Sequence, residues 1–188
     1  METLKAITNR KSVRTYNSTP VDKETVRTIV EAGNMAAGTP MAGKVYFTVI
    51  SNQSILDQLV SSAKAVMQNS GNPMLEKISG NPNFNPIYGA PVAVIISTDK
   101  TNDPNTQAMA RANAACAGQN MLLAATDLGL GSCYLESPTL AFYNPEMRKA
   151  VRMDEKWQPQ AVIVFGHTDD STPHAERSAN PDNITYID

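Results

Sequence analysis

The alternation of apolar and polar residues predicts a chain that mixes helices with strands. Residues 90–97 and 160–165 are almost entirely apolar, which is typical of strands buried on both faces. Residues 45–50 are rich in β-branched and aromatic side chains and predict a third strand. The alternating segment 184–187 predicts a strand without a partner nearby, so we expect an arm that reaches another subunit.

Apolar residues at helical spacing predict several helices around these strands. One of them is expected to open at Thr19-Pro20, with the threonine as its N-cap, and to stop at Gly33. The longest, residues 104–128, is small and apolar nearly all round, which predicts a helix covered on several sides in the middle of a dimer. Residues 69–88 form a long excursion, either over a site or over the surface. The other predicted helices cover residues 4–7, 53–68, 74–78 and 145–151.

Composition narrows the function. The chain has 188 residues, 41% hydrophobic and 18% charged, which suits one domain, residues 1–188, with its own core, or one protomer of an obligate dimer. A formal net charge of −2 argues against a dedicated nucleic-acid binder. No apolar run approaches the roughly 20 residues that span a bilayer, the start lacks a signal-peptide core, and two cysteines are too few for a disulfide framework. We therefore expect a cytoplasmic protein that binds neither membranes nor nucleic acids.

The candidate binding chemistry begins with the run Arg10-Lys11-Ser12-Val13-Arg14. Its cations would be costly to bury without partners. Guanidinium groups match phosphate oxygens two at a time, and a serine hydroxyl adds a further bond, so the run would make a good anion site. In an extended backbone, Arg10, Ser12 and Arg14 point one way, and Lys11 and Val13 point the other. On these five residues alone, a solvated basic patch between two helices is the simpler interpretation.

Other motifs fit less well. Gly38, Gly43 and Lys44 have the spacing of a P-loop, but Val45 stands where Ser or Thr should bind magnesium. The predicted strand also follows this loop, whereas a P-loop follows its strand. The cysteines and histidines lack zinc-site spacing, and the Gly-Leu-Gly after the long helix lacks the third glycine of a dinucleotide fingerprint. Cys133 has apolar flanks, which favour packing over reactivity.

Further elements follow in a fixed order along essentially the whole chain. They are the Arg10-x-Ser12-x-Arg14 pattern, a helix and small-residue loop before a strand, Ala90-Pro91 at the start of a buried strand, Leu-Gly-Leu-Gly-Ser-Cys at 128–133, a strand that ends at Gly166, and a late Arg177. No single element is decisive. Together they resemble the nitroreductase family of FMN-dependent oxidoreductases.

The resemblance implies an α+β, three-layer fold in which helices flank a central mixed sheet. It also implies a homodimer that exchanges its C-terminal arms. The implied cofactor is FMN, with NAD(P)H as a transient electron donor and a small planar electron acceptor such as a nitroaromatic or a quinone. In such a site the flavin takes and passes hydride at N5, and the protein supplies position and electrostatics without an acid–base dyad.

The resemblance also implies roles for the basic residues. Arg10, Ser12 and Arg177 would hold the FMN phosphate, with Lys11 close by. Arg14 would face the N1/O2 edge of the isoalloxazine, where a positive charge stabilises the anionic reduced flavin.

Two further groups of residues would border the flavin ring. Backbone groups near Leu135, Glu136 and Ser137 would meet N5 and O4. A small-residue loop of one subunit would border the ring bound mainly by the other subunit. Its implied contacts are Ala37, Gly38, Thr39, Met41 and Gly43.

The chain departs from the family pattern in two places. Met41 and Gly43 stand where the family commonly has an Asn and a Gln against the flavin, so amide contacts to the pyrimidine edge are expected only from Asn83 or Asn85. Ala-Glu precedes the late arginine where a basic residue is common, and His174 is the candidate substitute.

Three alternatives to a general NAD(P)H-dependent reductase stay open. One is a flavin reductase or dehalogenase with a single dedicated substrate. The second is a protein that stores or senses FMN without turnover, and the third is a structural dimer with an empty pocket. Phe84 and Tyr88, in the excursion, are the aromatic residues expected over the flavin.

Overall fold

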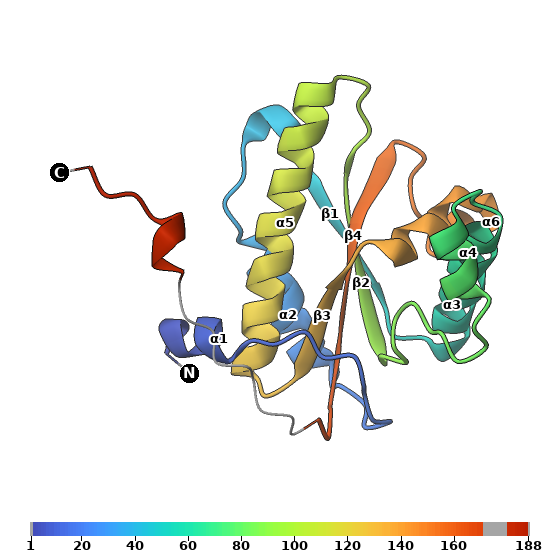
Figure 1. Cartoon of the computed structure of the whole chain (residues 1–188), viewed down its shortest axis with the longest axis horizontal. Helices are drawn as coiled ribbons and strands as arrows, with labels where there is room; N and C mark the ends of the chain where they lie inside the picture. Colours follow the sequence, from blue (N-terminus) through green and yellow to red (C-terminus); the bar gives the residue numbers. More distant parts are fainter. Residues whose placement is uncertain (1, 171–179, 188) are drawn as a thin grey trace.

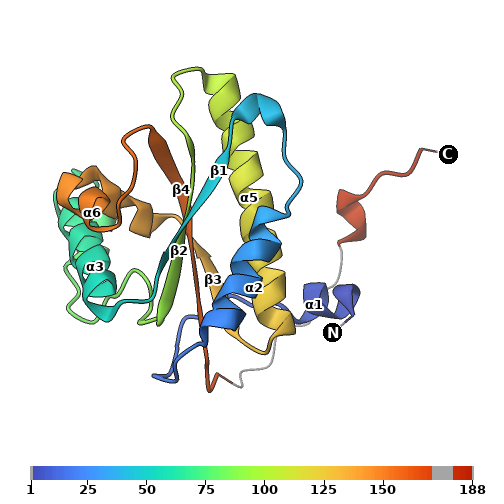
Figure 2. The same cartoon turned by 180° about the vertical axis from the view of Figure 1, so that it is seen from behind.

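The computed structural model describes residues 2–170 and 180–187, and it places one sheet between helices (Figures 1 and 2). Its four strands lie in the order β1 (Val45–Ile50), β2 (Val92–Asp99), β4 (Trp157–Gly166) and β3 (Gly131–Leu135). Neighbouring strands are antiparallel throughout. An isolated bridge between Ser12 and Ser132 is parallel. Within the described residues, the sheet is therefore antiparallel and not mixed as expected, and the parallel pairing is confined to this isolated bridge.

Helices cover both faces of the sheet. One face carries α1 (Thr3–Asn9), α2 (Lys23–Asn34) and α5 (Pro104–Asp127), and the other carries α3 (Gln53–Gln68), α4 (Pro73–Ser79) and α6 (Pro145–Ala150) (Figures 1 and 2). Short 3-10 helices are η1 (Pro40–Ala42), η2 (Ser137–Tyr143) and η3 (Pro181–Asn183). The expected three-layer α+β fold is confirmed.

The core has two halves, one on each face of the sheet. Ile96, Met121 and Phe165 are fully buried between the sheet and the α2–α5 layer, and Leu59 and Val164 are fully buried on the α3 side. β2 and β4 contribute to both halves, which confirms the prediction that they are buried on both faces. Within the described residues, no helix combines the length and the apolar character needed to cross a bilayer.

The start of α2 differs from the prediction that it opens at Thr19-Pro20. The N-cap is Asp22, whose carboxylate accepts hydrogen bonds from the backbone N–H of Thr25 (2.9 Å) and from its hydroxyl (2.6 Å). These bonds lower the pKa of the Asp22 carboxyl below its ordinary value. Thr19 instead donates its backbone N–H to Asn17 Oδ1 (3.0 Å). A carboxylate that accepts two bonds is a stronger cap than the earlier threonine.

The prediction that Gly33 stops this helix is also wrong, because α2 continues to Asn34. A Cβ atom at Gly33 would lie 2.6 Å from Met121 Cγ and 3.3 Å from the carbonyl oxygen of Ala117. Glycine is therefore required here for the close approach of α2 and α5, and not for a left-handed helix end.

The long helix α5 spans Pro104–Asp127, as predicted. Ala114 and Ala117 are buried against the sheet, whereas Ala112, Ala115 and Cys116 are exposed in the single chain. The exposed residues are as small and uncharged as the buried ones. If α5 lay in the middle of a dimer, as predicted, the partner subunit would cover these exposed residues.

Residues 180–187 extend away from the rest of the chain (Figures 1 and 2). The predicted strand at 184–187 is not formed, and Tyr186 and Ile187 are 80% and 93% exposed. An extended segment becomes a strand only when another strand pairs with it, and no described strand of the same chain does so. The exchanged arm stays a prediction.

Candidate functional site

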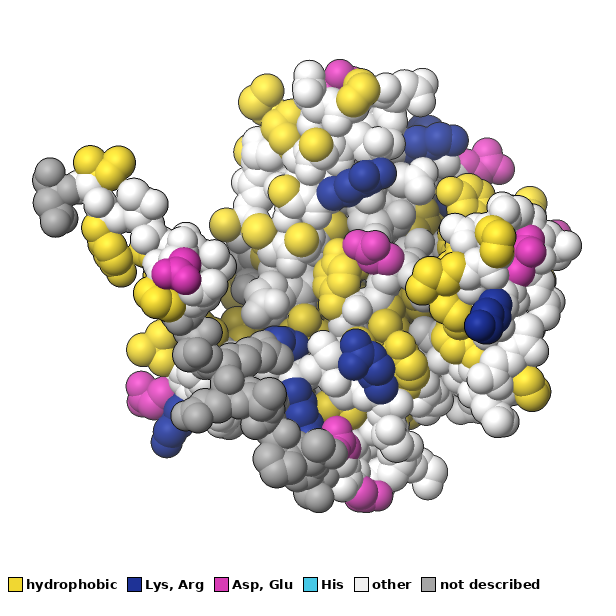
Figure 3. Space-filling view, viewed as in Figure 1, with side chains coloured by type: hydrophobic (Ala, Val, Ile, Leu, Met, Phe, Trp, Pro, Cys, Tyr) yellow, Lys and Arg dark blue, Asp and Glu magenta, His cyan; other side chains and the backbone are white. Residues whose placement is uncertain are grey.

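The basic run crosses the start of β3. Ser12 forms a parallel bridge with Ser132, and the backbone N–H of Val13 donates to the Ser132 carbonyl (2.9 Å). Val13 is buried, whereas Ser12 and Arg14 are exposed, as the predicted extended backbone requires. In the space-filling view, Lys and Arg side chains gather on the lower central part of the face, over the region that this run crosses (Figure 3).

A glycine allows this close crossing. A Cβ atom at Gly131 would lie 2.8 Å from Val13 Cγ1 and 3.0 Å from Thr168 Cγ2. Any larger residue would push the basic run off the strand. Gly131, the first residue of β3, therefore sets the position of the candidate anion-binding groups.

The run is also held by the residues after β4. The Thr168 hydroxyl donates to the Thr15 carbonyl (2.7 Å), and the Asn17 backbone N–H donates to the His167 carbonyl (3.0 Å). The Tyr16 hydroxyl donates to the Val13 carbonyl (2.8 Å), and burial raises the pKa of Tyr16. The phosphate-binding candidates thus lie on a segment that is held at its C-terminal end.

Three of the predicted residues act on one buried atom, the Cys133 thiol. Burial raises the pKa of Cys133, while Arg14, a hydrogen bond from Ser12 and Arg10 each oppose that rise. The basic residues and Ser12 thus act electrostatically on the same strand that Ser12 bridges, β3. Cys133 itself is buried in the core, which confirms the predicted packing role.

Lys11 points differently from these three residues. Its ammonium donates to the backbone carbonyl of Asp170 (2.9 Å) and pairs with the Asp170 carboxylate (3.2 Å). Lys11 therefore ties the basic run to the chain after β4. Arg177 and His174 lie outside the described residues, so their predicted roles stay predictions.

The other end of β3 carries the second predicted group. Leu135 is the last residue of β3, Glu136 is exposed, and Ser137 begins η2. A strand rises about 3.3 Å per residue, so Leu135 lies roughly 10 Å along β3 from Ser132. The candidate phosphate-binding groups and the candidate ring-binding backbone thus lie at opposite ends of one strand. Their separation is about the length of the ribityl chain that joins the phosphate of FMN to its ring.

The loop at residues 37–43 lies near the other end of α5 (Figures 1 and 2). Asn113 binds it from α5: Asn113 Oδ1 accepts from the Thr39 N–H (3.0 Å), and Asn113 Nδ2 donates to the Thr39 carbonyl (3.0 Å). Asp99 accepts from the Lys44 N–H (2.8 Å) and leaves room only for glycine at Gly43, where φ is +74°. A single chain therefore does not bring this loop to the basic run, as expected for a loop that serves another subunit.

The loop also borders a cavity of about 400 Å³, which is lined in part by Ala37, Gly38, Thr39 and Gly43. Met41 is not in this lining and is 76% exposed. Sequence analysis missed Asn113 as the residue that holds the loop. Its signal in the sequence was an amide flanked by alanines on both sides.

The excursion forms a wall beside Arg14. Arg14, Phe84 and Tyr88 line one cavity of about 700 Å³, together with Asn83 and Asn85. The Arg14 guanidinium carbon lies 5.9 Å from the centre of the Tyr88 ring, which is within cation–π range. Arg14 is the predicted partner of the N1/O2 edge of the flavin. The residues expected near the flavin all line the same cavity as Arg14; they are Asn83, Phe84, Asn85 and Tyr88.

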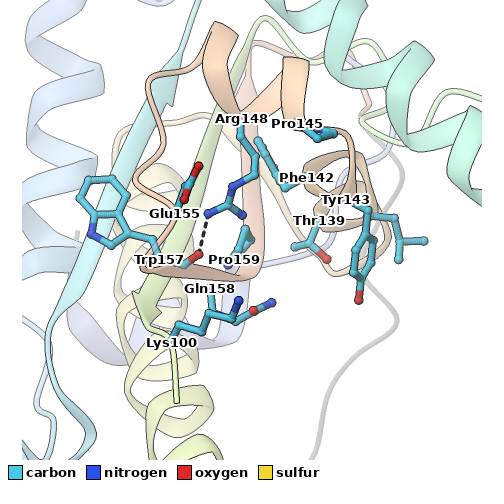
Figure 4. Close-up of a pocket in the computed structure, with 11 residues that line it drawn as sticks. Lys100, Thr139, Phe142, Tyr143, Pro145, Arg148, Glu155, Trp157, Gln158 and Pro159 are labelled. Carbon is cyan, nitrogen blue, oxygen red and sulfur yellow. Dashed lines mark hydrogen bonds between the residues drawn. The ribbon is translucent and has the colours of Figure 1, made fainter. Parts of the chain in front are cut away.

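A separate cavity of about 420 Å³ lies between η2, α6 and the start of β4 (Figure 4). It contains none of the predicted site residues. Arg148 reaches across it and donates to the backbone carbonyls of Asp154 (2.7 Å) and Trp157 (2.9 Å). The guanidinium of Arg148 thus binds backbone carbonyls of the same chain, and Arg148 links α6 to the start of β4.

We expect Arg148→Ala to lower the free energy of unfolding by about 1–3 kcal/mol, because two charge-assisted hydrogen bonds are lost and their carbonyls are left without that donor. Urea denaturation of both proteins measures the change. The neighbouring Lys149, which is exposed, supplies the control: Lys149→Ala should stay within about 0.5 kcal/mol of the wild type. Equal stability of the two variants would contradict the assigned link.

Comparison with solved protein structures defines the class of fold. A nitroreductase of Bacteroides fragilis, solved with bound FMN, is similar at a TM-score of 0.88 and 26% identity, and the match covers 100% of both chains. A nitroreductase of Desulfitobacterium hafniense, also solved with bound FMN, is similar at a TM-score of 0.81 and 22% identity, over 99% of this chain and 98% of that one.

The family follows from the sequence. The Nitroreductase family profile matches residues 7–167, and the chain belongs to this family. A relative from Methanothermobacter thermautotrophicus, named "Putative NADH dehydrogenase/NAD(P)H nitroreductase", is 28% identical over 189 residues, which cover 98% of this chain and 86% of the relative. The resemblance predicted from the motifs is confirmed.

Proposed function

We propose that this protein is an FMN-dependent oxidoreductase that uses NAD(P)H to reduce nitroaromatics, quinones or similar small electrophiles. The observation that carries the proposal is the crossing of the basic run over the start of β3, where Ser12 bridges Ser132 and Arg14 lies beside Tyr88 of the excursion. Residues 135–137, of which Glu136 is exposed, follow at the other end of the same strand. Relatives solved with FMN or named NAD(P)H nitroreductase support it.

The donor set suits a phosphorylated flavin. Arg10 and Ser12 would bind the phosphate together with Arg177, and Lys11 would hold the segment in place through Asp170. Arg14 would lie against the N1/O2 edge, while the backbone of Leu135–Ser137 would orient the N5/O4 side. FMN would supply the redox chemistry by accepting hydride from NAD(P)H at N5 and passing it to the acceptor.

The complete site is proposed to need two copies of a single-domain chain. The loop with Ala37, Thr39 and Met41 lies away from the basic run of its own chain and would border the flavin of the partner. The exposed stripe of Ala112, Ala115 and Cys116 on α5 would be covered in such a homodimer. Residues 184–187 would gain a strand partner there, and the dimer would act in the cytoplasm.

Steady-state oxidation of NADH and NADPH, with menadione or a nitrofuran as acceptor, tests this function. We expect the purified protein to be yellow, to bleach on addition of NAD(P)H under anaerobic conditions, and to oxidise the coenzyme continuously once the acceptor is present. A yellow protein with negligible turnover would instead be a storage or sensing protein. A colourless protein that gains no thermal stability from added FMN would contradict the proposal altogether.

A further inference from the structure

The cavity beside Arg14 has an unusual chemical lining. Within the described residues, it includes two cations, Arg14 and Lys77, three asparagines and two aromatic rings, but no carboxylate. Lys77 lies in the last turn of α4. The neighbouring acid, Glu76, is turned away, because its carboxylate accepts a hydrogen bond from the backbone N–H of Gly71 (3.0 Å).

Two of the three asparagines that line the cavity keep an amide NH₂ group as a donor. Asn81 Oδ1 accepts from the backbone N–H of Asn83 (3.0 Å), and Asn85 Oδ1 accepts from the backbone N–H of Ile87 (2.9 Å). An amide whose oxygen is bound to the backbone keeps its NH₂ group as a donor. Amide donors and two cations together favour an anion over a neutral or cationic group.

The wall that carries these groups is held in one position. The Lys64 ammonium donates to the carbonyls of Asn81 (3.3 Å) and Phe84 (3.1 Å). Tyr88 has a φ of +56°, which is uncommon for a residue with a large side chain, and its N–H donates to the Asn85 carbonyl (3.0 Å). This backbone conformation places the Tyr88 ring against Arg14.

We infer that this cavity selects planar electron acceptors that carry an anionic group, such as an aromatic carboxylate. The ring of the acceptor would lie among Phe84 and Tyr88, and its carboxylate would be bound by Lys77 and the asparagine amides. The inference rests on the proposed function, because it assigns the acceptor of that same site. With a nitro acceptor, Ar–NO₂, NAD(P)H and one proton give Ar–NO, NAD(P)⁺ and water. One N–O bond and the donor C–H bond break, and two electrons pass to the nitro group.

The test compares 4-nitrobenzoate with 4-nitrobenzamide, which share a ring and a nitro group but differ in charge. We expect kcat/KM to favour the anion by about three- to tenfold at low salt, and less at high salt. Lys77→Gln should reduce this ratio toward one, and Lys77→Arg should retain it. Lys100, which lines the separate cavity of Figure 4, gives the control: Lys100→Gln should leave the ratio as in the wild type. An equal ratio in wild type and Lys77→Gln would overturn the inference.

A binding measurement separates this inference from the proposed function. Isothermal titration of the holoprotein with each compound should give a lower Kd for 4-nitrobenzoate, and Lys77→Gln should remove the difference. Preferential anion binding without turnover would contradict the proposed function and support the selectivity. Turnover of both compounds without any preference in kcat/KM or Kd would do the opposite.

Discussion

Replacement of Arg10 by alanine is expected to raise the Kd for FMN by about 5- to 150-fold. The physical reason is the loss of a charge-assisted contact to the phosphate, which contributes about 1–3 kcal/mol. Titration of the apoprotein with FMN, followed by quenching of flavin fluorescence, measures the Kd directly.

Arg27 provides the matched control for this experiment. It is an exposed arginine on α2 that pairs with Glu24 and Glu31, remote from the basic run in sequence. Arg27→Ala should bind FMN as the wild type does, which would show that general loss of positive charge is not the cause. An unchanged FMN Kd in a folded Arg10→Ala variant would remove Arg10 from the phosphate site.

The second large effect concerns stability. Phe165 is fully buried in β4 and pairs in register with Val92 of β2 and Ser132 of β3. Phe165→Ala is expected to cost about 3–5 kcal/mol, because it removes a large buried ring and leaves a cavity. For a chain of this size, that corresponds to a drop of roughly 6–20 °C in Tm. Thermal and urea denaturation measure it.

The same substitution should also weaken FMN binding, because Ser132 is the residue on which the basic run rests. Met74→Ala, at a side chain that is 70% exposed, is the control and should change stability by less than about 0.5 kcal/mol. If Phe165→Ala lost no more stability than Met74→Ala, the assigned core would be wrong.

Local patterns in the sequence were enough to predict most of the fold. The apolar runs of β2 and β4 predict strands buried on both faces. Apolar spacing predicts the helix around Leu59, and the long run of small apolar residues around Ala117 predicts a helix covered on several sides. The start of α2 differs from the prediction because the Asp22 carboxylate binds the Thr25 N–H and hydroxyl, whereas the predicted cap, Thr19, takes part in a turn with Asn17. The predicted role of Gly33 was wrong for a different reason, since its close contact with Met121 depends on packing between distant segments.

For the candidate site, the sequence predicts which residues share a side of the chain but not their distant partners. If the backbone of Arg10–Arg14 is extended, the alternation places Val13 on the side opposite Ser12 and Arg14, and the structure shows Val13 buried and the other two exposed. Lys11 binds Asp170, and Lys64 donates hydrogen bonds to carbonyls of the excursion. Both contacts join residues that are far apart in sequence. No local pattern contains such contacts. The C-terminal alternation at 184–187 predicts only that a strand can form when a partner is available.

The central claim is that the basic run at the start of β3 binds the phosphate of FMN. The most direct test is a titration of the wild-type apoprotein with FMN and, separately, with riboflavin, which is the same flavin without phosphate. We expect FMN to bind at least about tenfold more tightly, because the charge-assisted contacts at Arg10 and Ser12 require the phosphate. Equal Kd values for the two flavins would contradict it.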